Sequence, residues 1–435
     1  MIQPHTHIPK ILILLLAVLL LLSIIACEST KKQKKTQVEE QKRQAQETDA
    51  MEKLAQEAME QSFLENFFPD STPIVTAETA FQNSDTVLMT FAGDIMAHAP
   101  NYSRGHYDEI YKDIESIIQE SSLSFANLET PVDEKKSFST YPNFNVHQSY
   151  SNAAIDAGFN VFSLANNHTN DQGIEGILET KKYFDSIMQQ TSESNRPVYA
   201  CGLKDSPASP FTYNVIQQNG WTVLFMAITE ILNQNAHASY INYIRTDEMS
   251  RKKFIQQITE LREQNPCDIF VLSIHCAEPE YILSISKKQA EFYHQLTDAG
   301  VDVLWANHPH VAKEWELLKD SESIPRKMIF YAMGNTISAQ RTNPSFSNPN
   351  LPREYTGEGY IAQVRFLKDD DGIRIVNINP TIITTYITPD LLYVIKRLDE
   401  SFIQSLKDEK RDKWANYLEQ RIKLMKNIKG KTTWQ

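Results

Sequence analysis

Short apolar segments that alternate with amphipathic segments constrain the fold of this chain more than any other feature. Seven segments predict buried strands: TVLMTFAGD (86–94), LSFANLE (123–129), NVFSLANNH (160–168), WTVLFMAITE (221–230), CDIFVLSIH (267–275), VDVLWANHPH (301–310) and RKMIFYAMGN (326–335). Helical periodicity lies between them at 106–121, 152–158, 173–187 and 287–300. Strands that are almost continuously apolar and separated by helices indicate an α/β fold with a largely covered sheet.

The pattern changes after Arg353. Two strand-like segments, GYIAQVRFL and IRIVNINP, flank the sequence DDDG and predict a hairpin with an Asp-Gly turn. Residues 391–428 are amphipathic and highly charged, so we expect helices there that pack on the domain or bind a partner.

Residues 1–27 predict an export signal, because Lys10 precedes a long apolar run that ends in Ala26 and Cys27. A cysteine after a small residue resembles the lipobox of bacterial lipoproteins, with Cys27 as the lipidated residue. The alternative is an uncleaved anchor helix, although the run is at the short end of what spans a bilayer, about 17 residues. Under either reading we expect the rest of the chain outside the cytoplasm, attached to the cell membrane.

Residues 28–50 are charged and rich in glutamine, which predicts a solvated tether, and 51–68 have helical spacing. The predicted organisation is therefore a signal peptide at 1–27, a tether and helix at 28–85, a main domain at 86–385 and a C-terminal helical extension at 386–435.

Charge and cysteine content narrow the function classes. The net charge of −12 argues against a nucleic-acid partner, which favours a basic surface. Cys201, Cys267 and Cys276 are odd in number and have no metal-binding or redox spacing, so we expect them to be reduced and structural.

Polar side chains that can bind metal end most of the predicted strands: Asp94, Glu129, Asn167 with His168, His275, and His308 with His310. Ligands bind beyond the carboxyl ends of strands in open α/β sheets, so we expect these side chains to share one site. Carboxylate, amide and imidazole donors suit divalent ions such as Mn²⁺, Fe²⁺ or Zn²⁺, and their number allows two ions.

Single members of this set are weak signals. A lone histidine such as His275 is more often a satisfied core residue, and Glu129 could cap a helix or pair with Lys135. The ordered series along one domain carries the prediction. Histidines at positions 98, 106, 147, 237 and 294 have no such context, and for them we expect solvated or structural roles. Asn166 suits a turn, because asparagine tolerates a left-handed backbone.

The motifs FAGDIM, ANLETPV, AGFNVFSLANNHTNDQGIEGILET, IHCAEPEY, DAGVDVLWANHPHV and IFYAMGN together resemble the capsule-synthesis protein CapA family of poly-γ-glutamate capsule proteins, within the calcineurin-like metallophosphatase superfamily. The resemblance covers about residues 86–380. It implies a four-layer α/β/β/α sandwich with a dinuclear metal centre. Matched residue by residue, it implies metal ligands at Asp94, Asn167, His275, His308 and His310, a bridging carboxylate at Glu129, and a proton donor or phosphate contact at His168.

The sequence also departs from the superfamily pattern. Met96 stands where the Asp-x-His motif has its histidine, and Glu129 is one methylene longer than the usual aspartate. The segments HCAEPEY and ANH also differ from the family's His-Trp-Gly and Gly-His types. Each change affects a metal site, so phosphatase activity does not follow from the fold.

Two functions remain open. One is an accessory role in capsule or poly-γ-glutamate biosynthesis or export, beside synthase or export subunits, in which the site binds an anionic polymer or stabilises the fold. The other is an active dinuclear-metal hydrolase of a phosphoester or a cell-envelope polymer.

Overall fold

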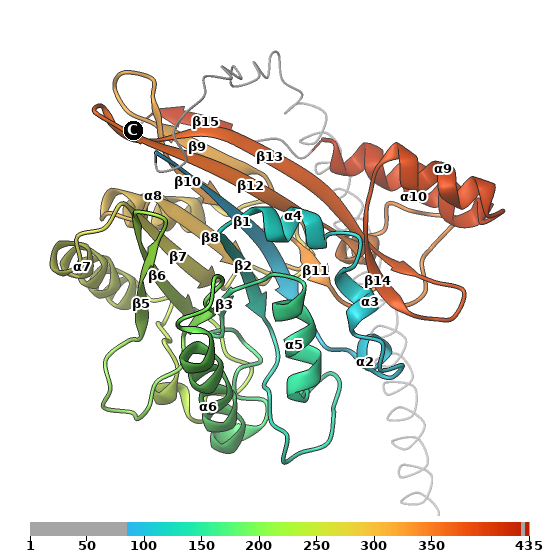
Figure 1. The fold of residues 1–435 in the computed structure, drawn as a ribbon, viewed down its shortest axis with the longest axis horizontal. Helices are drawn as coiled ribbons and strands as arrows, with labels where there is room; N and C mark the ends of the chain where they lie inside the picture. The colour runs from blue at the N-terminus through green and yellow to red at the C-terminus, as the bar shows by residue number, and fades with distance from the viewer. Residues whose placement is uncertain (1–84, 428–430, 435) are drawn as a thin grey trace, which may run out of the picture. The chain divides into compact units, whose positions relative to one another are not determined.

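Two β-sheets packed face to face form the centre of the fold in a computed structural model, which describes residues 85–427 and 431–434 (Figure 1). In the first sheet the strand order is β14-β13-β12-β1-β2-β3-β4, and β11 also pairs with β1. Its strands are β1 (Thr86–Ile95), β2 (Leu123–Leu128), β3 (Val161–Ser163), β4 (Tyr199–Cys201), β11 (Asn335–Ile337), β12 (Glu358–Asp369), β13 (Gly372–Ile387) and β14 (Tyr393–Arg397).

The second sheet has the order β15-β9-β10-β8-β7-β6-β5. Its strands are β5 (Tyr213–Gln218), β6 (Trp221–Thr229), β7 (Ile269–His275), β8 (Val303–Asn307), β9 (Trp315–Lys319), β10 (Pro325–Phe330) and β15 (Lys431–Trp434). Strands β1 to β4 are parallel to one another, and so are β6, β7, β8 and β10. The carboxyl ends of the parallel strands therefore lie together at one edge of each sheet.

Aromatic side chains fill the space between the sheets. Phe91 and Phe125 of the first sheet stack with ring centroids 4.7 Å apart, and Phe125 meets Phe225 of the second sheet at 5.5 Å. The indole Nε1 of Trp305 in β8 donates a hydrogen bond to the carbonyl oxygen of Ala92 in β1, at 2.9 Å. This packing fixes the strand ends of one sheet against those of the other.

Helices cover the outer face of each sheet (Figure 1). The first sheet carries α3 (Asp108–Tyr111), α4 (Glu115–Glu120), α5 (Gln148–Asp156) and α6 (Gly173–Thr191), and the second carries α7 (Glu248–Gln264) and α8 (Lys287–Asp298). The short helices are α2 (Ala99–Tyr102), η1 (Ala238–Tyr240) and η2 (Pro352–Gly357). The predicted four-layer α/β/β/α sandwich is therefore confirmed.

The C-terminal region is where the sequence prediction was partly wrong. Residues 391–428 were expected to be helical, but Tyr393–Arg397 forms β14 and pairs antiparallel with β13, with Thr385 opposite Ile395. The segment YVIKR is rich in residues that favour strands, and the open edge of β13 satisfies its backbone. The helices are α9 (Glu400–Asp408) and α10 (Asp412–Met425), and they pack on this end of the sheet through an apolar cluster that includes Trp414.

Smaller differences concern element lengths. The expected helix at 106–121 is divided into α3 and α4, and the expected strand at 326–335 ends at Phe330, with Asn335 beginning β11. The predicted hairpin is confirmed as β12 and β13. The three cysteines of the described region are unpaired, as expected.

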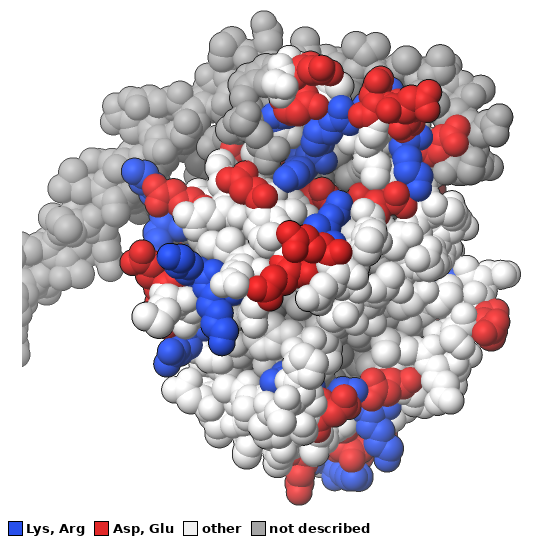
Figure 2. Space-filling model, turned by 90° about the vertical axis from the view of Figure 1, so that its left-hand side faces the viewer, with Lys and Arg blue, Asp and Glu red and all other residues white. Residues whose placement is uncertain are grey.

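The signal peptide, Cys27, the tether and the predicted helix at 51–68 lie outside the described residues. Among the helices that the structure does describe, none is long and apolar enough to cross a bilayer. On the face shown in Figure 2, acidic and basic side chains are intermingled and much of the surface carries no charge.

Candidate metal centre

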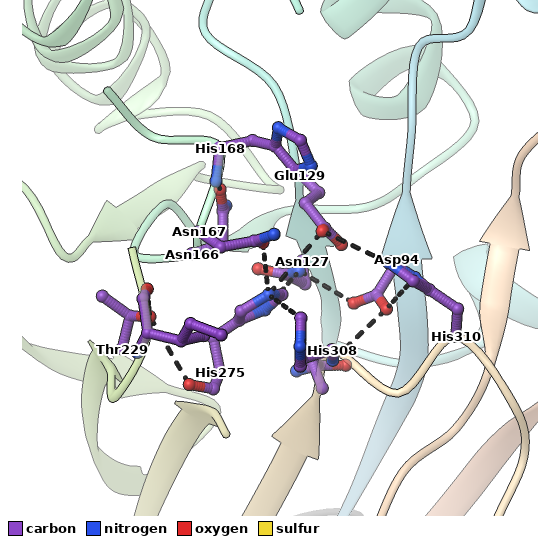
Figure 3. Close-up of polar contacts among 12 residues, drawn as sticks. Asp94, Asn127, Glu129, Asn166, Asn167, His168, Thr229, His275, His308 and His310 are labelled. Carbon is purple, nitrogen blue, oxygen red and sulfur yellow. Dashed lines mark hydrogen bonds and ion pairs between the residues drawn. The ribbon is translucent and has the colours of Figure 1, made fainter. Parts of the chain in front are cut away.

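The carboxyl ends of the parallel strands bring the predicted polar side chains to one place between the sheets (Figure 3). Asp94 in β1 lies beside Asn127 on the neighbouring strand β2, and His275 in β7 lies beside Asn307 in β8. Gly93 allows this arrangement at Asp94, because a Cβ at Gly93 would lie 1.8 Å from the carbonyl oxygen of Gly334.

Two groups of three side chains have donor atoms close enough for one cation. The groups are Glu129 with His308 and His310, and Asp94 with Glu129 and His275, and within each the donor atoms lie within 4.8 Å of one another. All five side chains are buried. Glu129 belongs to both groups, so its carboxylate could contact a cation held by either one.

Asn167 extends this donor set. Its Oδ1 lies 2.8 Å from Nε2 of His275, and Nδ1 of His308 lies 3.2 Å from the same nitrogen. The sequence-predicted ligands are therefore neighbours in space, with the amide oxygen of Asn167 directed at an imidazole rather than at solvent.

Glu129 is the residue whose surroundings most require a cation. Its side chain is 0% exposed, yet neither carboxylate oxygen has a hydrogen-bond partner among the described residues. Its Oε1 lies 3.6 Å from His275 Nε2 and 3.7 Å from His310 Nε2. A buried carboxylate without donors is costly, so these residues fit a divalent cation, which would satisfy both oxygens.

The pKa shifts agree with that reading. Burial, followed by the charges of Asp94 and Glu280, raises the pKa of Glu129 well above its usual value. Burial and the neighbouring imidazoles lower the pKa values of His275 and His308 far below normal. Both imidazoles are thus neutral near pH 7, the form that binds metal.

His310 differs from the other two histidines. Its Nδ1 lies 3.1 Å from Oδ2 of Asp94 and 3.0 Å from Oδ1 of Asn335. Burial works against a charge on this ring, but the hydrogen bond and the charge of Asp94 outweigh burial and raise its pKa. His310 is therefore oriented by two partners at Nδ1, while Nε2 faces Glu129.

The backbone of the histidine loop is strained at both ligand positions. His308 has φ of 104° and His310 has φ of 56°, in the left-handed region that side chains other than glycine rarely adopt. Strained backbone of this kind collects at functional sites, where the surrounding structure holds it.

His168 lies beside the donor groups but has a different environment. Its Nδ1 lies 2.7 Å from Oδ2 of Asp171, which also accepts a hydrogen bond from the backbone N–H of Phe144 at 2.8 Å. Its Nε2 has no partner within the described part of the chain. This pairing holds the ring with Nε2 open, as a group that gives or takes a proton must be held.

Sequence reasoning missed several side chains that support the site. Nδ2 of Asn127 donates to Oδ1 of Asp94 at 2.8 Å, and Nδ2 of Asn233 lies 3.2 Å from His168 Nδ1. Asn127 stands two residues before Glu129 and was accessible to the same strand-end argument. Asn335 ends the motif IFYAMGN and was accessible to that argument too. Asn233 lies in a segment with no motif, so only the fold identifies it.

Met96, where the superfamily pattern has a histidine, is buried and 1% exposed. A thioether is a weak ligand for hard ions, so position 96 would supply no good donor to a divalent cation.

Comparison with known proteins gives several matches. A profile of the family described as "Bacterial capsule synthesis protein PGA_cap" matches residues 88–340. The "Capsule biosynthesis protein CapA" of Bacillus anthracis is 26% identical over 61% of this chain and 62% of its own length. The "PGA biosynthesis protein CapA" of Bacillus subtilis (strain 168) is 25% identical over 61% of this chain and 67% of its own. The chain thus spans about two thirds of these relatives or slightly less.

A solved structure, the "calcineurin-like phosphoesterase YfkN from Bacillus subtilis", matches 77% of this chain and 99% of its own, with a TM-score of 0.38 and 12% identity.

Proposed function

Because the chain belongs to the bacterial capsule synthesis family PGA_cap, as its motifs predicted, we propose that it acts in capsule or poly-γ-glutamate biosynthesis or export through a metal-dependent, phosphoesterase-like site. The buried carboxylate of Glu129, between two groups of imidazole and carboxylate donors, is the observation that carries the proposal. Its two unsatisfied oxygens need a cation, and a cation there would activate water near neutral pH or hold an anionic polymer.

The residues of the chain take separate roles in this proposal. One or two divalent ions are held by Asp94, Asn167, His275, His308 and His310, and Glu129 lies between these ligands. The candidate ions are Mn²⁺, Fe²⁺ and Zn²⁺. Asp171 orients His168 so that its Nε2 can give a proton to a leaving-group oxygen. The aromatic rings of Phe144 and His168, with centroids 4.6 Å apart, keep this imidazole in place.

The test of the site is metal content, measured by elemental analysis of the purified protein, and turnover of bis-p-nitrophenyl phosphate after loading with Mn²⁺. We expect at least one equivalent of bound metal. We also expect His168→Gln to lower turnover about 10²- to 10⁴-fold while it leaves the metal content unchanged. A purified protein that binds no Mn²⁺, Fe²⁺ or Zn²⁺ would contradict the proposal.

A second candidate function, the accessory role without hydrolysis, is favoured by the missing histidine at Met96. In that case the protein would bind metal and a poly-γ-glutamate chain but would not hydrolyse bis-p-nitrophenyl phosphate. Synthase or export subunits would supply the chemistry. Metal binding by a wild type that shows no turnover of the diester would support this alternative over the hydrolase.

The place of action is proposed from the N-terminal residues alone. Cys27 would carry the lipid that attaches the protein to the outer side of the cell membrane. Labelling of cells with radioactive palmitate tests this, with Cys27→Ala as the matched variant. Label in the wild type but not in the variant is expected, and normal processing of Cys27→Ala without label in either protein would contradict it.

A further inference from the structure

His98, which carries no motif of its own, is fixed close to the metal centre by a distant part of the chain. We call residues 338–341, which follow β11, the strap. The backbone N–H of Ala339 in the strap donates to Nδ1 of His98 at 3.3 Å. Because Nδ1 accepts this bond, the proton of a neutral His98 ring is on Nε2.

The Nε2 of His98 is available to a ligand. It has no hydrogen-bond partner in the described residues, and the side chain is only partly buried. The His98 ring meets Phe144 edge to face with centroids 5.1 Å apart, and Phe144 meets His168 in the same way. His98 and His168 therefore lie on the same aromatic ring, each with Nδ1 held by the protein.

The two imidazoles differ in what they can do. Burial, with the charges of His310, His168 and Arg353, lowers the pKa of His98 to about 3. His98 is thus neutral at working pH and offers a fixed N–H donor. His168 pairs with a carboxylate at Nδ1 and leaves Nε2 to exchange a proton. One ring is suited to hold an oxygen atom, and the other is suited to protonate one.

Arg353 is held by the residue next to Ala339 in the strap. Its Nε donates to the carbonyl oxygen of Gln340 at 2.8 Å. The side chain is exposed, and no carboxylate of the described chain pairs with its two terminal nitrogens. Its positive charge contributes to lowering the pKa of His98. A guanidinium anchored at Nε presents its other donors as a fork that matches an oxyanion.

The strap also connects these two side chains to the metal centre. Oε1 of Gln340 accepts a hydrogen bond from Nδ2 of Asn335 at 2.9 Å, and Oδ1 of Asn335 lies 3.0 Å from Nδ1 of His310. The strap therefore hydrogen-bonds directly to His98 and Arg353, and through Asn335 it is connected to His310.

We propose that His98 and Arg353 form an oxyanion-binding subsite beside the metal centre, which holds a phosphate or carboxylate group of the substrate. The inference rests on the proposed function, because it assigns the class of group that this centre binds. Neither residue would touch the metal ions, and both would contribute to substrate binding rather than to the loading of metal.

The experiment measures anion binding by the full-length protein in detergent, with isothermal titration calorimetry. Inorganic phosphate and glutarate are the two probes, each titrated into Mn²⁺-loaded and metal-free protein. The variants are His98→Leu and Arg353→Gln, which remove the donors, and His98→Gln and Arg353→Lys, which keep a donor at a similar place. Matched controls are His106→Leu and Arg245→Gln, which change an exposed histidine and an exposed arginine in other segments.

We expect His98→Leu and Arg353→Gln to weaken binding of the preferred anion at least tenfold, with Mn²⁺ content unchanged. The two conservative variants should recover part of the affinity, and the controls should match the wild type. Preference for phosphate or for glutarate identifies the source of the oxyanion, and either preference supports the subsite. Thermal unfolding shows whether His98→Leu folds. If it does not, Arg353→Gln, which changes an exposed side chain, and His98→Gln still test the subsite.

Binding that stays within twofold of the wild type in both His98→Leu and Arg353→Gln would overturn the inference, and so would a wild type that binds neither anion. Failure of the proposed function looks different. In that case the wild type would contain no metal, while loss of anion binding in Arg353→Gln could still be measured on the metal-free protein.

Discussion

Two buried glutamates, Glu129 and Glu358, occupy opposite situations in the same fold. Both side chains are 0% exposed. Glu129 has no hydrogen-bond partner for either oxygen in the described region. Glu358, at the start of β12, pairs through Oε1 with Arg341 and accepts bonds at Oε2 from Nε and Nη2 of Arg421, at 2.8 and 2.6 Å.

Their pKa values shift in opposite directions for this reason. Burial raises the pKa of Glu129, and the nearby carboxylates raise it further. Burial also opposes ionisation of Glu358, but the charges of Arg341 and Arg421 outweigh it and lower the pKa. The same side chain at the same depth is therefore structural where donors surround it and a candidate ligand where they do not.

The cluster around Glu358 connects the C-terminal helices to the sheets. Arg421 lies in α10, and its Nη1 also donates to the carbonyl oxygen of Pro349 at 2.7 Å. Nη2 of Arg341 donates to the carbonyl oxygen of Thr385 in β13 at 2.6 Å. Arg341 belongs to the strap, so the structural cluster and the proposed anion subsite share one segment.

The largest effect is expected from Glu358→Ala, which leaves two buried guanidinium groups without their carboxylate. Removal of one partner from a buried charge pair costs about 3–5 kcal/mol in the free energy of unfolding. Urea denaturation of the wild type and the variant measures the difference. A loss under about 1 kcal/mol would show that the cluster is not a structural ion pair.

Glu129→Gln should have the opposite profile. We expect Mn²⁺ affinity to fall at least about 100-fold, or about 2.8 kcal/mol at 1.4 kcal/mol per tenfold change. The free energy of unfolding of the metal-free variant should not decrease, because no donor to the carboxylate is lost. Calorimetric Mn²⁺ titration and urea denaturation measure the two quantities. A variant that is destabilised without metal and still binds Mn²⁺ would show that Glu129 is a structural residue like Glu358.

Asn335→Ala tests the surroundings of the ligands rather than a ligand. Asn335 contacts His310 at Nδ1 and donates to Ser338, Gln340 and the carbonyl oxygen of Thr356. Loss of a partner that orients a ligand typically lowers metal affinity about 10- to 100-fold, and we expect the lower end because Asp94 remains. The same Mn²⁺ titration measures it. An unchanged affinity would mean that Asp94 alone orients the ring.

The last prediction concerns the pH dependence of metal binding. The raised pKa values of Glu129 and His310 mean that both hold protons in the metal-free site at pH below those values, and a cation must displace them. Affinity should therefore rise with pH, by up to about tenfold per unit for each proton released, and level off above the raised pKa values. Titrations in buffers of different ionisation enthalpy count the protons, and Glu129→Gln should release one fewer.

Sequence reasoning found the sheet strands that end in polar residues because that pattern is local. The run from Thr86 to Asp94 and the run from Val303 to His308 each contain their own apolar core and polar end. It failed for β14, because the helical spacing of the residues after it concealed a five-residue strand whose partner, β13, is set by tertiary pairing. The same holds for α3 and α4, where a single helical pattern was divided by a turn.

The sequence by itself determined the fold class, the family and the side chains that can bind metal, because apolar periodicity and motif spacing are properties of neighbouring residues. Only the tertiary structure decided that Glu129 lies between two donor groups with no hydrogen bond of its own. It also brought His98 and Arg353 to one strap, although His98 and Ala339 are 241 positions apart in the chain. Contacts between such distant residues depend on how the sheets pack, and no local pattern encodes that packing.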